Sequence, residues 1–220
     1  MDIARSFSYI LDDEQWWKKA LIGGLLSLIP VVGTFYMMGY VLQTLQNIIK
    51  GQETPLPEVL EDLSGKIVKG LILFLITFVY MLPLIIIAAC AGGGAPILAE
   101  QIDGSEAQAI LPAIWGSCFG CLALLYGIAM SLLLPFVWGE YAMTEQIGSA
   151  FRLGKIFSML KSNIGPAFIV IVVGGLAGML ASLAGTLLCG IGLFFTMFYA
   201  QLVTAFLYGS LYKQAQSAVL

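Results

Sequence analysis

The sequence predicts an all-α fold, a polytopic bundle of transmembrane helices, from its composition and its long uncharged stretches. Of its 220 residues, 60% are hydrophobic and only 10% are charged, whereas soluble domains are about half apolar and a quarter charged. Lipid offers a backbone no hydrogen-bond partners, so a spanning segment has to satisfy its own polar groups, which favours helices. We therefore expect a single membrane domain over residues 1–220.

Four apolar stretches give the order of the spans: 20–49, 70–91, 110–138 and 164–212. A helix needs about 20 residues to cross the bilayer core, so the second and third stretches are single crossings. The fourth is long enough for two crossings, with a turn near 185–192. This predicts about four full spans, divided between a first half (1–91) and a second half (112–220) that are joined by a loop at 92–111.

The basic residues predict which side of the membrane each flank faces. The loop at 92–111 has no lysine or arginine but carries Glu100, Asp103 and Glu106. Lysine and arginine gather on the cytoplasmic side of membrane proteins. Here they occupy the other flanks: Arg5, Lys18, Lys19, Lys50, Lys66, Lys69, Arg152, Lys155, Lys161 and Lys213. We therefore expect an external loop at 92–111, both termini in the cytoplasm, and a location in the inner (plasma) membrane.

The first apolar stretch, 20–49, is predicted as a short or re-entrant helical hairpin. Lys19 and Lys50 flank it and should both be cytoplasmic, so the chain has to enter the membrane and return. About 30 residues divide into two arms of only about 22 Å each at 1.5 Å per residue. Pro30, followed by Gly33, supplies the break, because proline removes a helix donor. The alternative is one kinked, tilted helix, which would put Lys19 outside.

Two less apolar segments predict amphipathic helices at the inner membrane surface. Residues 144–162 carry an approximate helical stripe of apolar side chains, with basic residues elsewhere. The stripe consists of Ile147, Phe151, Ile156, Met159 and Leu160. Residues 3–17 end in two tryptophans, which favour the headgroup level. We interpret both segments as interfacial anchors, and the alternative is that they sense the lipid surface.

The two ends of the chain share a weak internal repeat. Gly33–Tyr40 aligns with Gly192–Tyr199 and matches it at glycine, phenylalanine, methionine and tyrosine. Gln43 and Gln201 fall at similar places after these blocks. Interrupted segments at matching places point to a binding site in transporter folds, so these two glutamines, with the hairpin tip, are candidate pathway residues. Chance similarity and ordinary interhelical hydrogen bonds are the alternatives.

A run of glycines, prolines and aromatic residues in the first 90 residues resembles a known family. It comprises Gly23–Gly24, Ile29–Pro30, Gly33, Gly39–Tyr40, Gly51, Leu56–Pro57–Glu58, Gly70, Tyr80 and Pro83. The chain resembles a bacterial and archaeal membrane protein family, domain of unknown function 4013, and the later part is similar in pattern only. The resemblance implies a polytopic membrane protein and no particular activity.

The side chains predict no enzyme. The chain has no histidine, which removes Ser-His-Asp triads and the commonest metal ligand. No phosphate-binding glycine loop is present, and we expect no cofactor, no metal and no nucleic acid partner. Charged residues are missing from the middle of the apolar stretches, where ion-coupled carriers place them. Glu140 and Glu145 follow the third stretch, and we expect them to be solvated.

The four cysteines all map to the predicted outer half of the membrane: Cys90, Cys118, Cys121 and Cys189. One interpretation is a thiol cluster that forms disulfides in an oxidising compartment. The other, which we favour, is that each cysteine packs as a small apolar residue. A helical Cys-x-x-Cys lacks the strand-to-helix context of a thioredoxin motif.

Small residues recur at helical spacing in two of the stretches: Gly116, Gly120, Ala123 and Gly127, and Gly174, Gly178, Ala181 and Gly185. Such spacing forms a groove in which another backbone can approach closely. We favour packing between helices of the same chain. The alternative is an interface for self-association or for a membrane protein partner.

Two functions fit these features. The first is a non-catalytic accessory or structural subunit that binds membrane lipids or a partner protein through its grooves and interfacial helices. The second is a small-solute channel or transporter that uses the broken hairpins. A transporter should have a polar cavity lined by Gln43, Gln201 and the hairpin tips. A subunit should have a dry helix core and an apolar groove.

Overall fold

The computed structural model describes residues 3–100, 105–188 and 192–219, and all regular structure within them is helical. The all-α prediction is therefore confirmed. The helices are α1 (Arg5–Ser8), α2 (Trp16–Ser27), α3 (Val32–Lys50), α4 (Leu63–Glu100), α5 (Ser105–Thr144), a 3₁₀ turn (Ile147–Phe151), α6 (Leu153–Ser162), α7 (Ile164–Leu187) and α8 (Gly192–Val219).

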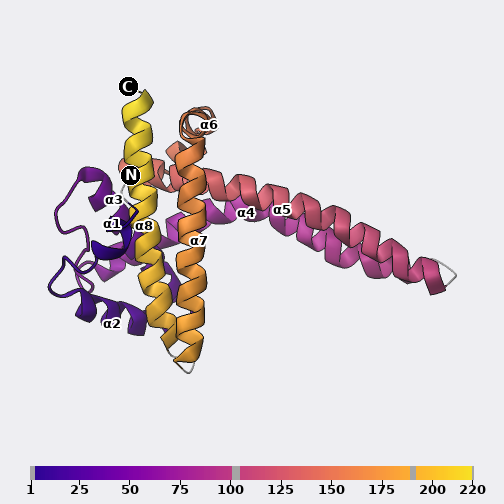
Figure 1. The fold of residues 1–220 in the computed structure, drawn as a ribbon, viewed down its shortest axis with the longest axis horizontal. Coiled ribbons are helices and arrows are strands. Elements are labelled where there is room, and N and C mark those ends of the chain that lie inside the picture. Colours follow the sequence, from indigo (N-terminus) through magenta and orange to yellow (C-terminus); the bar gives the residue numbers. More distant parts are fainter. Residues whose placement is uncertain (1–2, 101–104, 189–191, 220) are drawn as a thin grey trace. The chain divides into compact units, whose positions relative to one another are not determined.

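Four of the described helices are long and apolar enough to cross a membrane, as the sequence predicts. The candidate spans are Leu63–Gly94, Ile110–Thr144, Ile164–Leu187 and Gly192–Ser217. The fourth apolar stretch divides into α7 and α8 at the predicted place, and these two helices lie side by side in Figure 1. The chain is thus built as an integral membrane protein.

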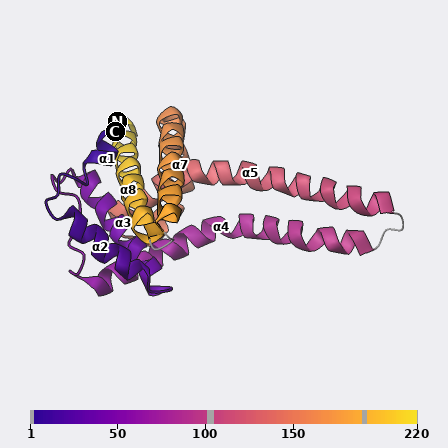
Figure 2. The ribbon, with the colours of Figure 1, turned by 60° about the horizontal axis from the view of Figure 1, so that its bottom comes forward.

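The chain forms two compact units, each of which is described by itself. The first, here called the body, comprises Met1–Ile76 and Leu132–Leu220. The second, the α4–α5 hairpin, comprises Thr77–Ser131, and its two helices run side by side in Figure 2. Most of the loop predicted at 92–111 is helical, because α4 continues to Glu100 and α5 begins at Ser105. Glu100 is the last residue of α4 and Glu106 lies in the first turn of α5, so the predicted loop is too long; Asp103 lies outside the described residues.

The chain breaks at Pro30 into two helices, α2 and α3, so the alternative of one kinked helix is wrong. Val31 has a φ of 66°, and the Val32 N–H donates to Pro30 O at 2.7 Å. Such a three-residue γ-turn is rare and strained. Gly33 follows directly, and a Cβ there would collide with the Leu26 carbonyl. Whether this pair of helices re-enters a membrane stays a prediction.

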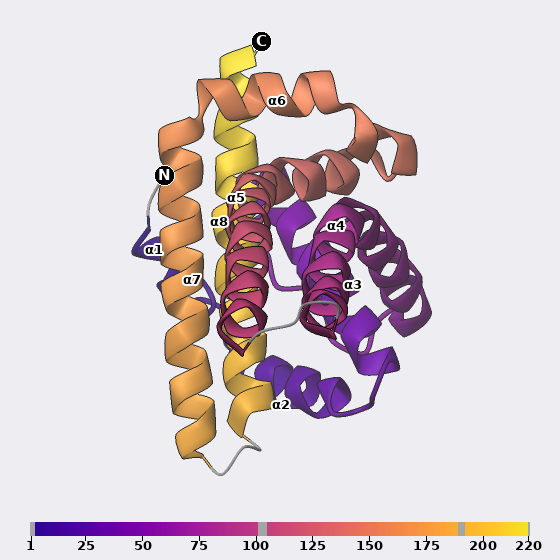
Figure 3. The same cartoon turned by 90° about the vertical axis from the view of Figure 1, so that its right-hand side faces the viewer.

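Helix α6 lies across one end of the α7–α8 pair (Figure 3). Its Ile156, Met159 and Leu160 are buried, so this part of the predicted apolar stripe faces inward, whereas Ile147 and Phe151 lie on the preceding 3₁₀ turn and are exposed. The predicted helix at 3–17 is much shorter, because only the single turn α1 forms. The Gln15 N–H donates to the Asp13 carboxylate at 2.8 Å, a side-chain turn that competes with helical hydrogen bonding.

The core of the body is closed by glycines that let helices approach closely. A Cβ on Gly39 would overlap the Lys66 carbonyl of α4, and one on Gly70 would overlap the Phe35 carbonyl of α3. These two family-like glycines therefore fix the α3–α4 crossing. They act on backbone shape, as expected of residues that carry no chemistry.

Candidate functional site

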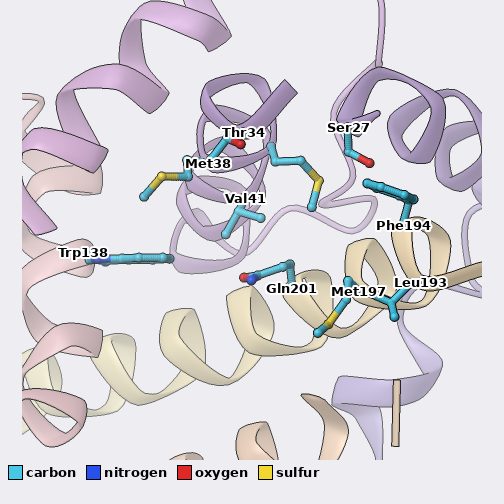
Figure 4. Close-up of a pocket in the computed structure, with 10 residues that line it drawn as sticks. Ser27, Thr34, Met38, Val41, Trp138, Leu193, Phe194, Met197 and Gln201 are labelled. Atoms are coloured by element: carbon cyan, nitrogen blue, oxygen red, sulfur yellow. The ribbon is translucent and has the colours of Figure 1, made fainter. Parts of the chain in front are cut away.

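A cavity of about 430 Å³ opens in the body between the α2–α3 break, the last part of α5 and the start of α8. Its lining is mostly apolar. The residues around it are Ser27, Thr34, Met37, Met38, Val41, Trp138, Leu193, Phe194, Met197 and Gln201, shown in Figure 4. We call this cavity the methionine pocket.

The pocket is built by one face of each of two crossing helices. On α8, Leu193, Met197 and Gln201 follow one another at steps of four, and so lie on one side of the helix. On α3, Thr34 and Val41 are two turns apart with methionines between them. The two helices meet next to the pocket, where the rings of Tyr40 and Phe198 lie 5.3 Å apart.

The chemistry of the lining is soft and apolar, with one polar group that stands out. Methionine side chains are flexible and polarisable, so they adapt to ligands of different shape. The Ser27 hydroxyl already donates to the Gly24 carbonyl at 2.6 Å. The Gln201 amide is exposed and has no hydrogen-bond partner among the residues that the structure describes. This amide is therefore available to a ligand.

The predicted pathway residues divide between the pocket and its surroundings. Gln201 lines the pocket, whereas the half-buried Gln43 is not part of the lining. Pro30 is exposed at the γ-turn and Gly33 is buried beside it, so both shape the hairpin without lining the cavity. The cavity lies where interrupted segments predict a binding site, but it is not the polar cavity expected of a transporter.

The two blocks of the weak repeat occupy equivalent positions. Gly33–Tyr40 lies at the start of α3, after the Pro30 break, and Gly192–Tyr199 lies at the start of α8, the helix that comes after α7 in the chain. Both blocks contribute side chains to the pocket. This placement accords with a duplication, which stays a prediction.

Residues 55–59 form an extended strap along α3, held entirely by side chains. Five successive carbonyls each accept a hydrogen bond: Asn47 Nδ2 donates to Pro55 O (3.0 Å), Lys19 Nζ to Leu56 O (3.2 Å), Tyr40 Oη to Pro57 O (2.9 Å), Lys66 Nζ to Glu58 O and Tyr36 Oη to Val59 O (2.9 Å). Buried backbone without such partners would cost stability. The strap therefore explains why an irregular segment packs against helices.

Lys19 joins the start of α2 to the strap. Its ammonium lies 2.8 Å from the Asp13 carboxylate and 3.0 Å from that of Glu58. Burial lowers the pKa of Lys19, but the hydrogen bonds to these two carboxylates outweigh it, so the pKa is raised. The start of α2 and the loop after α3 are therefore in direct contact.

Glu140 is fully buried in α5, so the expectation that it is solvated is wrong. Its carboxylate accepts hydrogen bonds from Lys155 Nζ of α6 at 2.8 Å and from Tyr212 Oη of α8 at 2.6 Å. Glu145 behaves as expected and is 55% exposed. Hydrogen bonds from Lys69 and Gln46 lower the pKa of Glu145.

Sequence reasoning missed Glu140 and the strap because their signals are indirect. Gly139 precedes Glu140, and a Cβ there would collide with the ring of Tyr212, so the Trp-Gly-Glu-Tyr run marks a close helix contact. For the strap, the signal is Pro55 and Pro57, whose nitrogens carry no proton to bury.

The described cysteines lie on the surface of the α4–α5 hairpin. Cys90, Cys118 and Cys121 are free and exposed, so the structure shows neither a disulfide nor tight packing at these three positions. Cys189 lies outside the described residues. Within the described part of the chain, no group of three or more histidine, cysteine, aspartate or glutamate side chains is arranged to hold a metal ion.

The small-residue stripes differ from one helix to the other. A Cβ on Gly116, Gly120 or Gly127 would meet no described atom of the α4–α5 hairpin within 4 Å, and Ala123 between them is half-buried. On α7, described neighbours crowd some positions and leave others open. A Cβ on Gly185 would overlap the Leu193 backbone, whereas one on Gly174 would meet Thr204 and Leu207 at ordinary distances. Ala181 is buried, and a Cβ on Gly178 would meet no described atom within 4 Å.

Comparison with known proteins identifies the family. No curated protein and no solved structure matches the chain. Residues 22–190 match the family described as protein of unknown function (DUF4013), a range that includes α3, the strap, Glu140 and α6. The chain belongs to this family of unknown function, DUF4013.

Proposed function

We propose that the chain is a non-catalytic membrane protein, an accessory or structural subunit, that binds a lipid-like amphiphile in the methionine pocket. The observation that carries this proposal is the lining, which is apolar except for a few polar groups, among them the unpartnered amide of Gln201. Sites for small molecules have this composition, with an apolar wall and a few polar groups that fix orientation.

The size of the pocket fits a hydrocarbon chain with a small polar group. A volume of about 430 Å³ lies within the range of roughly 300–1,000 Å³ for ligand sites. Hydrocarbon favours the methionine and aromatic walls because its transfer from water is favourable. A ligand oxygen that accepts from the exposed, unpartnered amide of Gln201 would fix the polar end of the ligand.

The ionisable groups of the body support binding rather than chemistry. Glu140 is paired with Lys155 and Tyr212, and Lys19 with Asp13 and Glu58. None of these residues lines the methionine pocket. The pocket therefore offers a ligand no acid, base or nucleophilic thiol.

Fluorescence of Trp138, which lines the pocket, tests the proposal. We expect a variant with Trp16, Trp17 and Trp115 replaced by phenylalanine, purified in detergent, to be quenched saturably by a fatty acid brominated on its chain. The unbrominated fatty acid should compete, because both occupy the same cavity. Filling the pocket with Met37→Phe and Met197→Phe in this background should weaken the affinity for the brominated fatty acid roughly fivefold or more, given about 1–3 kcal/mol for an overpacked site.

The matched control carries the same change outside the pocket, as Met143→Phe with Met179→Phe, since both methionines are exposed elsewhere in the body. It should bind the brominated fatty acid like the parent. Quenching that grows linearly without saturation, or that is equal in the filled and control variants, would contradict the proposal.

The alternative function is a small-solute channel or transporter. The position of Gln201 at the broken hairpins favours it, but the pathway predicted to include Gln43 would have to run outside the observed lining. Vesicles that hold the protein would then take up a small polar solute such as glycerol, and Gln201→Leu would abolish the uptake. We expect uptake no faster than in empty vesicles.

We also infer that both ends of the N-terminal hairpin face the cytoplasm, in the inner membrane of the cell. The contact between Lys19 and Glu58 supports a shared side, because residues 3.0 Å apart cannot lie on opposite faces of a bilayer. In a variant without native cysteines, Lys18→Cys and Gln52→Cys should be labelled by an impermeant reagent from the same side. Labelling from opposite sides would exclude the hairpin topology.

A further inference from the structure

The α6 region carries positive charge that nothing in the same part of the chain balances. After Glu145 the sequence contains no acidic residue through Leu220. Three of its four basic residues lie at α6: Arg152, Lys155 and Lys161. A basic amphipathic helix of this kind is typical of a membrane surface with negative charge.

The three basic residues have different environments. Lys155 forms an ion pair with the buried carboxylate of Glu140 at 2.8 Å, which joins α6 to the last part of α5. Arg152 and Lys161 are exposed, and their side chains form no hydrogen bond or ion pair with any residue that the structure describes. Two of the three cations are therefore free to meet an external anion, while the third holds the helix that carries them.

Exposed apolar side chains lie close in sequence to the two free cations. Leu153 and Phe157 of α6 are 48% and 46% exposed, and Ile164, where α7 begins, is 60% exposed. Figure 3 shows α6 lying across the end of α7, which is a candidate membrane span. With α7 across a membrane, α6 would lie at the depth where that span leaves the hydrocarbon, and its side chains would match the layer of headgroups and upper acyl chains.

We propose that Arg152 and Lys161 bind the phosphates of anionic phospholipids, with Leu153 and Phe157 inserted beside them. An acidic protein is the competing partner, but the exposed apolar residues next to the cations favour a lipid surface. This headgroup site is separate from the methionine pocket, since none of its residues lines that cavity. The test of this headgroup site is therefore independent of the test of the proposed function.

The experiment compares two lipids that differ only in headgroup charge. The full chain, delipidated in detergent, is titrated with phosphatidylglycerol or with phosphatidylcholine of the same acyl chains, and bound lipids are counted by native mass spectrometry. We expect a preference for phosphatidylglycerol. Each basic residue near an anionic surface contributes about 1 kcal/mol, so Arg152→Gln with Lys161→Gln should weaken phosphatidylglycerol binding roughly thirtyfold at low salt, and less as salt screens the charges.

Two controls separate charge from fold. Arg152→Lys with Lys161→Arg keeps both charges and should keep the lipid preference. Lys18→Gln with Lys50→Gln removes two exposed cations elsewhere in the body and should reduce phosphatidylglycerol binding by much less. Unchanged preference for phosphatidylglycerol in the neutral α6 variant, with thermal unfolding like that of the parent, would overturn the proposal. Equal binding of both lipids by the parent would also overturn it and would favour an acidic protein partner.

Discussion

The body and the α4–α5 hairpin are both apolar and helical, yet they are stabilised differently. In the body, polar side chains satisfy the strap, buried charges are paired, and glycines allow helices to touch. In the hairpin, residues 77–99 and 107–131 contain no charged side chain, and large residues such as Leu124 and Leu125 are more than 60% exposed. Lipid can cover such a surface, whereas the body needs specific internal contacts.

This difference predicts where substitutions should change the stability of the protein. A position in the core of the body is constrained by neighbours from distant segments of the chain. A position on the outer face of the hairpin is constrained mainly by its own helix. Matched substitutions in the two units therefore measure this contrast directly.

The largest contrast is expected at two glycines. Gly39→Leu should destabilise the protein by about 4 kcal/mol or more, because its side chain would meet the Lys66 backbone. Gly120→Leu faces open space within the hairpin and should change stability by about 1 kcal/mol or less, with a gain from helix propensity. Unfolding by a denaturing detergent measures both.

Gly120→Leu, compared with Gly39→Leu, also tests whether the small-residue stripe of α5 forms an interface between copies of the chain. If Gly120 lies at an interface between copies, Gly120→Leu should reduce the oligomer seen by size-exclusion chromatography while leaving the unfolding of the monomer unchanged. Equal destabilisation by both substitutions would show that the hairpin is as tightly constrained as the body.

The fold could be predicted from the sequence further than the site could. Apolar length and lipid physics predict the four spans, and Pro30 predicts the break between α2 and α3. The long helices of the hairpin were underestimated, because Gly92–Gly93–Gly94 and the acids near 100–106 are typical of a loop. In a hairpin with an apolar surface, the need to satisfy backbone groups favours helix, and α4 continues through the three glycines to Glu100.

The site could be predicted only in part, since it depends on contacts between distant segments. Gln201 was predicted as a candidate because of its place in the repeat. The methionines and Trp138 have no pattern of their own, and become a pocket only where α3 and α8 cross. Glu140 was misjudged because a carboxylate near a span end is usually solvated, whereas here α6 and α8 each bring it a donor.

The next largest effect on stability is expected at the ion pair between Lys155 and buried Glu140. Lys155→Met removes the cation that neutralises buried Glu140, and should destabilise the body by about 3 kcal/mol. Adding Glu140→Gln should restore part of this loss, because the orphaned charge is then absent. Equal stability of the single and double variants in detergent unfolding would show that the pair does not act as a unit.

Removing one hydrogen bond to the strap should have a smaller effect on stability. Tyr40→Phe leaves the Pro57 carbonyl without its donor and should destabilise by about 2 kcal/mol, the cost of an unsatisfied buried acceptor. In the hairpin, Tyr126→Phe also deletes a hydroxyl that donates to a carbonyl, that of Tyr80 at 2.6 Å. That acceptor lies within α4, where helical N–H groups serve the carbonyls, so the loss should be about half as large. A reversed order would contradict the assigned role of the strap.

The smallest expected effect is a pH dependence that belongs to the body alone. Because hydrogen bonds from Lys69 and Gln46 lower the pKa of Glu145, the folded protein favours the charged carboxylate. This contribution is present above the pKa of the unfolded state, about 4.3, and is lost as the pH falls through the lower folded value. The contribution of this pair should be about 1 kcal/mol or less, since the pair is partly exposed.

Detergent unfolding at pH 7 and near pH 3 measures this contribution, and Lys69→Met should reduce the difference in stability between the two pH values. A parent protein that became more stable on acidification through this range, while Lys69→Met did not, would reverse the sign and exclude the pair as its cause.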